Sequence, residues 1–125
     1  MNKRILVVDD EVSITKMIKL NLERTGHYEV RVENKGVKAI QAAIEFQPDL
    51  IFLDVMMPDL SGDVIATQLK ENKNLKDIKV IFLTAIVTRD ETADGGNKIG
   101  RNLFLAKPVT TLDLLRTIDN VLNGS

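Results

Sequence analysis

The sequence has 125 residues, of which 44% are hydrophobic, and its formal net charge is -1. This length favours one domain with a buried core, and the hydrophobic content excludes a disordered chain. A charge near zero gives no sign of general binding to nucleic acids or membranes. The absence of cysteine excludes disulfides, thiolate zinc sites and cysteine nucleophiles. No signal peptide or membrane-spanning stretch is evident, so a cytoplasmic domain is the default expectation.

The first part of the chain predicts strands and helices in alternation. Residues 5–8 form an unbroken apolar run that ends at two aspartates. Apolar residues spaced three and four positions apart lie between Ile14 and Leu22, which predicts an amphipathic helix, and Gly26 fits the position just after its end. Apolar and charged residues alternate over 28–33, which predicts a strand with one solvated side, most simply at a sheet edge.

The middle of the chain predicts two helices with a strand between them. Asn34 can cap the first helix, and Ser61 can cap the second. Residues 50–53 form an apolar run that ends at Asp54, with turn-forming residues on either side, so this strand should be buried on both faces. The residues expected to face inward from the two helices are Val37, Ile40, Ala43, Ile44, Val64, Ile65 and Leu69.

The last part of the chain predicts two more strands and a final helix. Residues 78–83 and 103–106 are the apolar runs that predict the strands. Thr110 and Asp113 have the spacing of a capping box, which predicts the start of the helix. Its expected inward residues are Leu112, Leu115, Ile118 and Leu122.

The alternation of strands and helices indicates an α/β fold with a parallel sheet. Crossovers between parallel strands should be right-handed, and the solvated second strand should lie at an edge beside the first. The strand order 2-1-3-4-5, with helices on both faces, satisfies both conditions. Because the carboxyl ends of parallel strands share one edge, Asp9, Asp10 and Asp54 should meet there. Thr84 and Lys107, which follow the fourth and fifth strands, should join them.

Three neighbouring carboxylates should raise one another's pKa, and a divalent cation would relieve their repulsion. The available ligands are hard oxygens without histidine or thiolate, so Mg²⁺ fits, Mn²⁺ is an alternative, and zinc does not fit. One carboxylate could also act as a nucleophile and form an acyl phosphate. Lys107 would then supply the positive charge that phosphoryl transfer needs, and Thr84 a hydroxyl donor.

Four motifs stand at the ends of these strands. They are Val7-Val8-Asp9-Asp10-Glu11, Asp54 with Met57-Pro58 and Gly62, Thr84-Ala85, and Lys107-Pro108. In this order and spacing they resemble the receiver domains of two-component response regulators, of the chemotaxis-regulator kind, and residues 1–125 are identified as one such domain. The resemblance implies a flavodoxin-like, doubly wound sheet of five parallel strands. It also implies a signalling domain that performs only its own phosphotransfer and dephosphorylation, rather than an enzyme.

The resemblance implies a phosphoryl and metal site at the ends of the first and third strands. Asp54 would be the phosphoacceptor, which receives its phosphoryl group from a sensor histidine kinase or a phosphotransfer protein. Asp9, Asp10, Asp54 and the backbone carbonyl of Met56 would hold Mg²⁺. Phosphorylation would then switch the binding of a downstream protein partner.

The resemblance also implies a switch at the ends of the fourth and fifth strands. Thr84 and Lys107 would contact the phosphoryl group, Phe104 matches the aromatic switch position, and the bond between Lys107 and Pro108 would be cis. Direct binding to nucleic acid or membrane is not expected, whereas a phosphorylation-dependent dimer is compatible with the family.

The sequence departs from the family's pattern in two places. Met56 and Ile86 are apolar where the family often has side chains that flank the incoming water, which predicts a long-lived acyl phosphate. The fourth helix of the family should be short or irregular here, because residues 88–100 contain three glycines within six positions and lack an apolar stripe.

Two other functions are compatible with parts of this pattern. A pseudo-receiver would bind partners without being phosphorylated, and the complete set of strand-end residues argues against it. An aspartate-nucleophile phosphohydrolase would carry Asp-x-Asp on its first strand, whereas this chain has adjacent Asp9 and Asp10. The sequence ends soon after the last predicted helix, so we expect no output domain within it; both a stand-alone regulator and the receiver of a longer protein fit this pattern.

Overall fold

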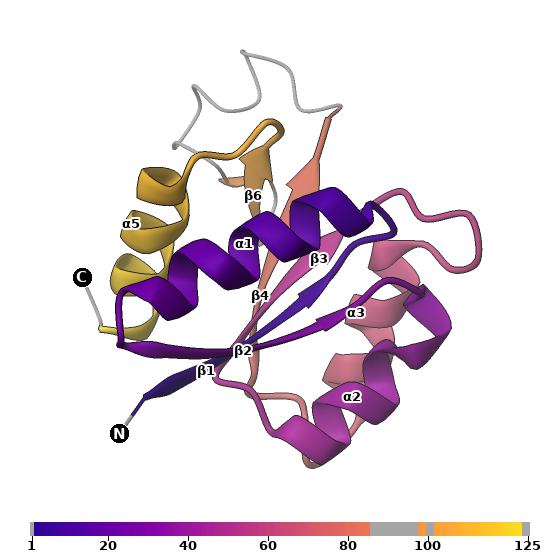
Figure 1. The fold of residues 1–125 in the computed structure, drawn as a ribbon. Helices are drawn as coiled ribbons and strands as arrows, with labels where there is room; N and C mark the ends of the chain where they lie inside the picture. The colour runs from indigo at the N-terminus through magenta and orange to yellow at the C-terminus, as the bar shows by residue number, and fades with distance from the viewer. Residues whose placement is uncertain (1, 86–97, 100–101, 124–125) are drawn as a thin grey trace.

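The structure is a computed structural model that describes residues 2–85, 98–99 and 102–123. Its described elements alternate between strand and helix for most of the chain (Figure 1). They are β1 (Lys3–Val8), α1 (Val12–Arg24), β2 (Tyr28–Glu33), the 3₁₀ helix η1 (Gly36–Lys38), α2 (Ala39–Phe46), β3 (Leu50–Asp54), α3 (Gly62–Glu71), β4 (Lys79–Thr84), β5 (Lys98–Ile99), β6 (Asn102–Ala106) and α5 (Thr111–Leu122).

The strands form one sheet in the order β2-β1-β3-β4-β6-β5. The first five pair in parallel, which confirms the predicted order 2-1-3-4-5, with β6 as the predicted fifth strand. The two-residue strand β5 pairs antiparallel with β6 at the far edge, an addition that the sequence pattern did not predict. The result is a flavodoxin-like, doubly wound sheet.

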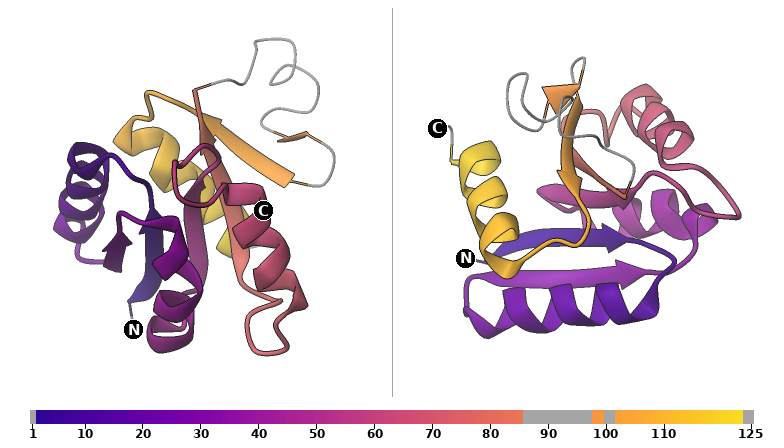
Figure 2. Two further views of the ribbon diagram at one scale, coloured as in Figure 1. Left: turned by 90° about the vertical axis from the view of Figure 1, so that its right-hand side faces the viewer. Right: turned by 90° about the horizontal axis from the view of Figure 1, so that it is seen from above.

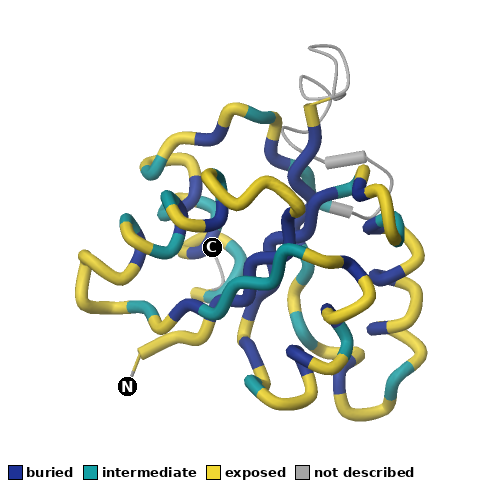
Figure 3. The backbone as a smooth tube through the Cα atoms, turned by 45° about the vertical axis from the view of Figure 1, so that its right-hand side comes forward, coloured by how far each residue is buried: buried dark blue, intermediate teal, exposed yellow. Residues whose placement is uncertain are grey.

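Two helical layers cover the sheet, with α1 and α5 on one face and α2 and α3 on the other (Figure 2). The alternation of side chains along each strand divides the core accordingly. On β1, Ile5 and Val7 pack with the α1 and α5 layer, while Leu6 and Val8 pack with the α2 and α3 layer. The central strands are therefore buried on both faces, as their unbroken apolar runs predict (Figure 3).

Strand β2 lies at the sheet edge, as the alternating pattern predicted. Its outward backbone groups are bound by side chains from α1. The Lys19 ammonium donates to the Val30 carbonyl at 2.6 Å, and the Val30 N–H donates to the Glu23 carboxylate at 3.1 Å. An edge strand with occupied backbone groups is a poor template for pairing with another strand.

The helix boundaries confirm two of the predicted caps. Thr110 and Asp113 form the capping box of α5, in which the Asp113 N–H donates to the Thr110 hydroxyl at 3.0 Å and the Thr110 N–H donates to the Asp113 carboxylate at 3.3 Å. Gly26 has a φ of 81° just after α1, a conformation that glycine adopts without strain. Ser61 is the N-cap residue of α3, where its hydroxyl bonds the Asp63 side chain instead of the backbone.

The predicted inward face of α2 was wrong in part. Val37 is 62% exposed and Ile44 is also exposed, while the buried residues of the helix are Ala39, Ala42 and Ala43. The first turn is the 3₁₀ helix η1, whose tighter winding shifts the face that the following residues present to the sheet. Asn34 is not the cap of this helix.

Val64 and Leu112 are also exposed, although both were predicted to face inward. Each belongs to the first turn of its helix, where the buried face is set by residues further along. That face is centred on Leu114 and Ile118 in α5. The predicted irregular fourth helix and Ile86 lie outside the described residues, except that Lys98 and Ile99, at the end of that stretch, form β5. No described helix has the length and apolar content needed to cross a membrane.

Candidate functional site

The parallel register brings five predicted site residues to the carboxyl end of the sheet. Val8 pairs with Leu53, so the residues that follow them, Asp9 and Asp54, lie side by side. Asp10 follows β1, Thr84 ends β4 and Lys107 follows β6, and together with Asp54 they line one pocket of about 370 Å³. The residues lining this pocket are Asp10, Glu11, Asp54, Met56, Thr84, Ala85 and Lys107.

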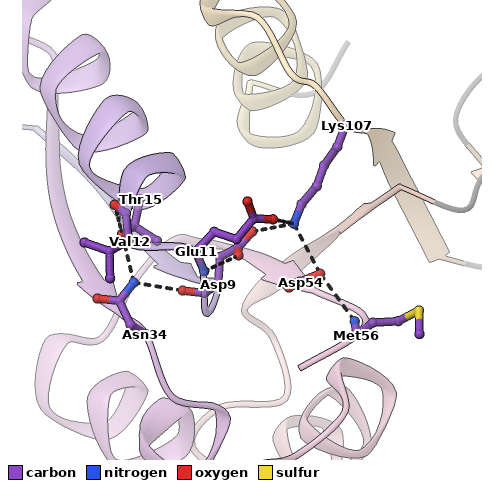
Figure 4. A network of polar contacts seen from close by, with 8 residues as sticks. All are labelled: Asp9, Glu11, Val12, Thr15, Asn34, Asp54, Met56 and Lys107. Carbon is purple, nitrogen blue, oxygen red and sulfur yellow. Dashed lines mark hydrogen bonds and ion pairs between the residues drawn. The ribbon is translucent and has the colours of Figure 1, made fainter. Parts of the chain in front are cut away.

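Asp9 is completely buried. Its Oδ1 accepts the backbone N–H of Glu11 at 2.9 Å. Within the described part of the chain its Oδ2 has no hydrogen bond of ordinary geometry, and the Lys107 ammonium, 2.8 Å away, compensates its charge (Figure 4). A buried carboxylate oxygen with a single compensating charge has capacity for a further cation.

The Lys107 ammonium faces several carboxylates at once. Besides Asp9, it lies 3.4 Å from Glu11 Oε1 and 3.5 Å from Asp54 Oδ1. Burial by itself would lower the pKa of Lys107, but the bond to Asp9 and the charges of Asp54 and Glu11 outweigh it, so its pKa is raised. The side chain therefore carries a firm positive charge at neutral pH.

Asp54 ends β3 and is only 4% exposed. Burial and the neighbouring charge of Asp9 raise its pKa to about 6, although Lys107 and the backbone N–H of Met56 act in the opposite direction. The Met56 N–H donates to Asp54 Oδ1 at 3.3 Å. Asp54 is thus a buried carboxylate with few donors that is still ionised above pH 6.

The aspartates fit a divalent cation. One carboxylate oxygen from each of Asp9, Asp10 and Asp54 lies within 4.8 Å of the others. Four carboxylates, those of Asp9, Asp10, Glu11 and Asp54, gather here, and three of them lie within 3.5 Å of the Lys107 ammonium. This gathering of hard anionic oxygens, which includes the buried Asp9 Oδ2, matches the preference of Mg²⁺ for carboxylates.

The remaining predicted residues lie around this pocket. Thr84 is buried at the end of β4, and the Lys107 N–H donates to its carbonyl at 2.9 Å. The side chain of Met56 is 62% exposed at the pocket rim. Phe104 is partly buried and stacks on Phe82, with ring centroids 5.2 Å apart, in the layer that contains α2 and α3.

The peptide bond between Lys107 and Pro108 is cis.

Two contributors to the site were not singled out from the sequence. Glu11 faces Lys107, and the Asn34 amide donates to the Asp9 carbonyl at 2.8 Å. The position of Glu11 beside two aspartates was a usable signal, whereas nothing in the sequence indicated the contact of Asn34.

A doubly wound parallel sheet with an acid-lined pocket at its carboxyl end defines a flavodoxin-like domain with a charged site at its switch point. Residues 5–119 match the family described as the response regulator receiver domain. The chain therefore belongs to this family, and it is a receiver domain of the two-component signalling proteins, similar in fold to the chemotaxis regulators.

Known proteins of this family match nearly the whole chain. The alkaline phosphatase synthesis transcriptional regulatory protein PhoP of Bacillus subtilis is 38% identical over 127 residues. The alignment covers 100% of this chain and 50% of PhoP, so the chain spans about half the length of that relative. Protein PilH of Pseudomonas aeruginosa is 38% identical, with 97% of this chain and 98% of PilH covered.

A solved structure gives the same result for the fold. Chemotaxis protein CheY4 of Vibrio cholerae superposes with a TM-score of 0.82 at 28% identity, covering 97% of this chain and 99% of CheY4. Receiver domains of this family are phosphorylated on aspartate, generally bind Mg²⁺ in an acidic pocket, and interact with histidine kinases or phosphotransfer proteins.

Proposed function

We propose that this domain accepts a phosphoryl group on Asp54 in a Mg²⁺-dependent reaction and thereby switches its binding to a protein partner. A carboxylate oxygen of Asp54 attacks the phosphorus of the donor, an O–P bond forms, and the P–N bond of a donor phosphohistidine breaks. The released imidazole takes up a proton. With a pKa of about 6, Asp54 is ionised at neutral pH and available for this attack.

Asp9, Asp10, Asp54 and the backbone carbonyl of Met56 would hold the cation, whose chemistry is to neutralise charge on the phosphoryl oxygens. Lys107 would also neutralise charge on the phosphoryl oxygens, because its ammonium already lies 3.5 Å from Asp54 Oδ1. As the phosphoryl group arrives, this ammonium can bind its oxygens, since the raised pKa of Lys107 keeps it charged.

The remaining residues would carry the signal away from the pocket. The hydroxyl of Thr84 would contact the phosphoryl group from the end of β4, which lies in the pocket. Phe104 lies on the next strand, packed on Phe82, and would change its packing when the Thr84 loop moves. A switch of this kind needs two packings of similar energy.

The phosphoryl donor would be a sensor histidine kinase or a phosphotransfer protein, and the reader a further protein. Both follow from membership of the family. A phosphorylation-dependent dimer is part of the proposal, and a cytoplasmic location stays a prediction from the sequence. The single observation that supports the proposal most strongly is the buried, poorly compensated carboxylate of Asp54 between two further aspartates and one lysine.

The direct test is mass spectrometry after incubation with acetyl phosphate and Mg²⁺. We expect one added phosphoryl group, lost in Asp54→Asn and retained in Asp77→Asn, an exposed acid outside the pocket. Asp10→Asn should weaken Mg²⁺ binding in a titration and slow the labelling, because it replaces a charged ligand with a neutral amide oxygen. A label that persists in Asp54→Asn would refute the assignment of the phosphoacceptor, and a parent that takes no label would favour the pseudo-receiver.

A further inference from the structure

The loop that follows Asp54 is tied to a segment that contributes no residue to the pocket. The carboxylate of Asp59 accepts the backbone N–H of Gly36 at Oδ1 and that of Val37 at Oδ2, both at 3.1 Å. Gly36 and Val37 lie in the connection between β2 and α2. The bond from Val37, followed by that from Gly36, helps to hold the pKa of Asp59 below its usual value, so the carboxylate is ionised when it makes these bonds.

Two glycines permit this close packing of chain segments. A Cβ atom on Gly36 would lie 2.8 Å from the carbonyl oxygen of Leu60, so a side chain there would push the two segments apart. Gly62 stands at the base of the same loop, where a Cβ would overlap the carbonyl oxygen of Asp54 and where its N–H donates to the Val55 carbonyl at 2.8 Å. The loop is therefore fastened at its base by backbone bonds and at its tip by Asp59.

The same segment also reaches the loop after β1. The side-chain amide of Asn34 donates to the Asp9 carbonyl at 2.8 Å and to the Thr15 hydroxyl at 2.9 Å (Figure 4). Asn34 is only two residues before Gly36. One short stretch, residues 34–37, thus bonds to two acidic loops of the site: the β1 loop (residues 9–11) and the β3 loop (residues 55–61). The predicted capping role of Asn34 is replaced by its contact with the β1 loop.

We propose that residues 34–37 form a bridge that sets the spacing between the two acidic loops, with Asn34 and Asp59 as positioning residues for the cation and phosphoryl site. This inference rests on the proposed function. The β1 loop carries two proposed ligands, and the β3 loop carries the proposed carbonyl ligand of Met56. Mg²⁺ requires near-ideal octahedral geometry, so its affinity depends on the distance at which the bridge holds these two sets of ligands.

The bridge can be tested without metal by amide hydrogen exchange. In Asp59→Ala we expect faster exchange at Gly36 and Val37, which lose their acceptor, and also at Met56, whose N–H bonds Asp54 rather than Asp59. Asp63→Ala is the matched control, because this exposed carboxylate bonds Ser61, two residues earlier, and has no contact with another strand or helix of the described residues. Unchanged exchange at Met56 in Asp59→Ala would overturn the proposal, since the cap would then act only locally.

The consequence for the site is tested by Mg²⁺ titration of variants shown by urea unfolding to be folded. We expect Asp59→Ala to raise the Mg²⁺ Kd about 3- to 10-fold, below the roughly 10- to 100-fold typical of residues bonded directly to a ligand side chain. The Mg²⁺ Kd of Asp59→Asn, which keeps one acceptor oxygen, should fall between those of the parent and of Asp59→Ala. A Kd equal to that of Asp63→Ala would contradict the proposal.

The bond from Asn34 to the Asp9 carbonyl gives an independent check through a double-mutant cycle. Asn34→Ala should also raise the Mg²⁺ Kd, and in combination with Asp59→Ala the two effects should not multiply, because both act through one segment. Independent effects would refute a shared bridge. If the parent itself bound no Mg²⁺ and took no label, the proposed function would fail, while faster exchange at Met56 in Asp59→Ala would still support positioning of the loop by Asp59.

Discussion

The ends of β1 and β3 carry the same chemical group in different surroundings. Asp9, at the end of β1, accepts the Glu11 N–H at 2.9 Å and lies 2.8 Å from the Lys107 ammonium. Asp54, at the end of β3, is almost as deeply buried, but its amide donor from Met56 is at 3.3 Å and the same ammonium is at 3.5 Å. Because the Lys107 ammonium lies closer to Asp9 than to Asp54, Asp9 anchors this cation while Asp54 is left to form a new bond.

The largest expected effect comes from removing the shared cation. Lys107→Met should lower the free energy of unfolding of the metal-free protein at pH 7.5 by about 3 to 5 kcal/mol, because Asp9 Oδ2 is buried and has no other partner among the described residues. Urea unfolding in EDTA measures this change. Lys79→Met is the control, since Lys79 is exposed and lies outside the site. Equal losses in the two variants would mean that Lys107 does not compensate the pocket.

The two carboxylates should respond to neutralisation with opposite signs. The pKa of Asp54 is about 6 in the folded protein, against an ordinary value of 3.8, so the folded state binds this proton more tightly than the unfolded state does. The stability that the proton contributes is complete below pH 3.8 and is lost as the pH rises through 6. Asp54→Asn should therefore be more stable than the parent by about 2 to 3 kcal/mol at pH 7.5 without metal, with a smaller gain at pH 5.

Asp9→Asn should instead destabilise the protein, because it removes the closest partner of Lys107. Urea unfolding at the two pH values, with Asp77→Asn as an exposed control, separates these outcomes. If Asp54→Asn is no more stable than the parent at either pH, the two strand ends do not differ as described.

A smaller effect is expected at the pocket rim. The exposed side chain of Met56 offers no good hydrogen bond to a water that attacks the phosphorylated aspartate. Met56→Asn should speed the loss of the phosphoryl group by about 3- to 10-fold, a change of roughly 1 kcal/mol in the barrier. The decay of the label after removal of acetyl phosphate gives the rate. A rate equal to that of the parent would show that this position does not limit hydrolysis.

The smallest effect is expected for Glu11, the exposed partner of Lys107. Its carboxylate is 3.4 Å from the ammonium and more than half exposed, so solvent screens the pair. Glu11→Gln should change the free energy of unfolding by less than about 0.5 kcal/mol. A loss comparable to that of Lys107→Met would place the main charge pair of the site on the wrong carboxylate.

Local patterns were sufficient to predict the parallel sheet and several residues of the pocket, although Glu11, which also lines the pocket, was not singled out. Unbroken apolar runs identified the buried strands, alternation identified the edge strand β2, and a spacing of three residues identified the capping box at Thr110. Once the strand order was constrained, Asp9 and Asp54 had to be neighbours, because parallel strands end at one edge of the sheet. These features depend on adjacent residues and on chain connectivity, both of which are present in the sequence.

Other features were decided only by tertiary packing. Val37 is exposed within the 3₁₀ turn at residues 36–38, and this turn changes the phase of α2, so that Ile44 is exposed as well. Asn34 bonds Asp9, 25 residues away, rather than its own helix. The unequal sharing of Lys107 depends on differences of less than 1 Å between side chains from β1, β3 and the end of β6. Sequence spacing carries no information at that scale, because such distances are set by how the strands and loops pack around a common pocket.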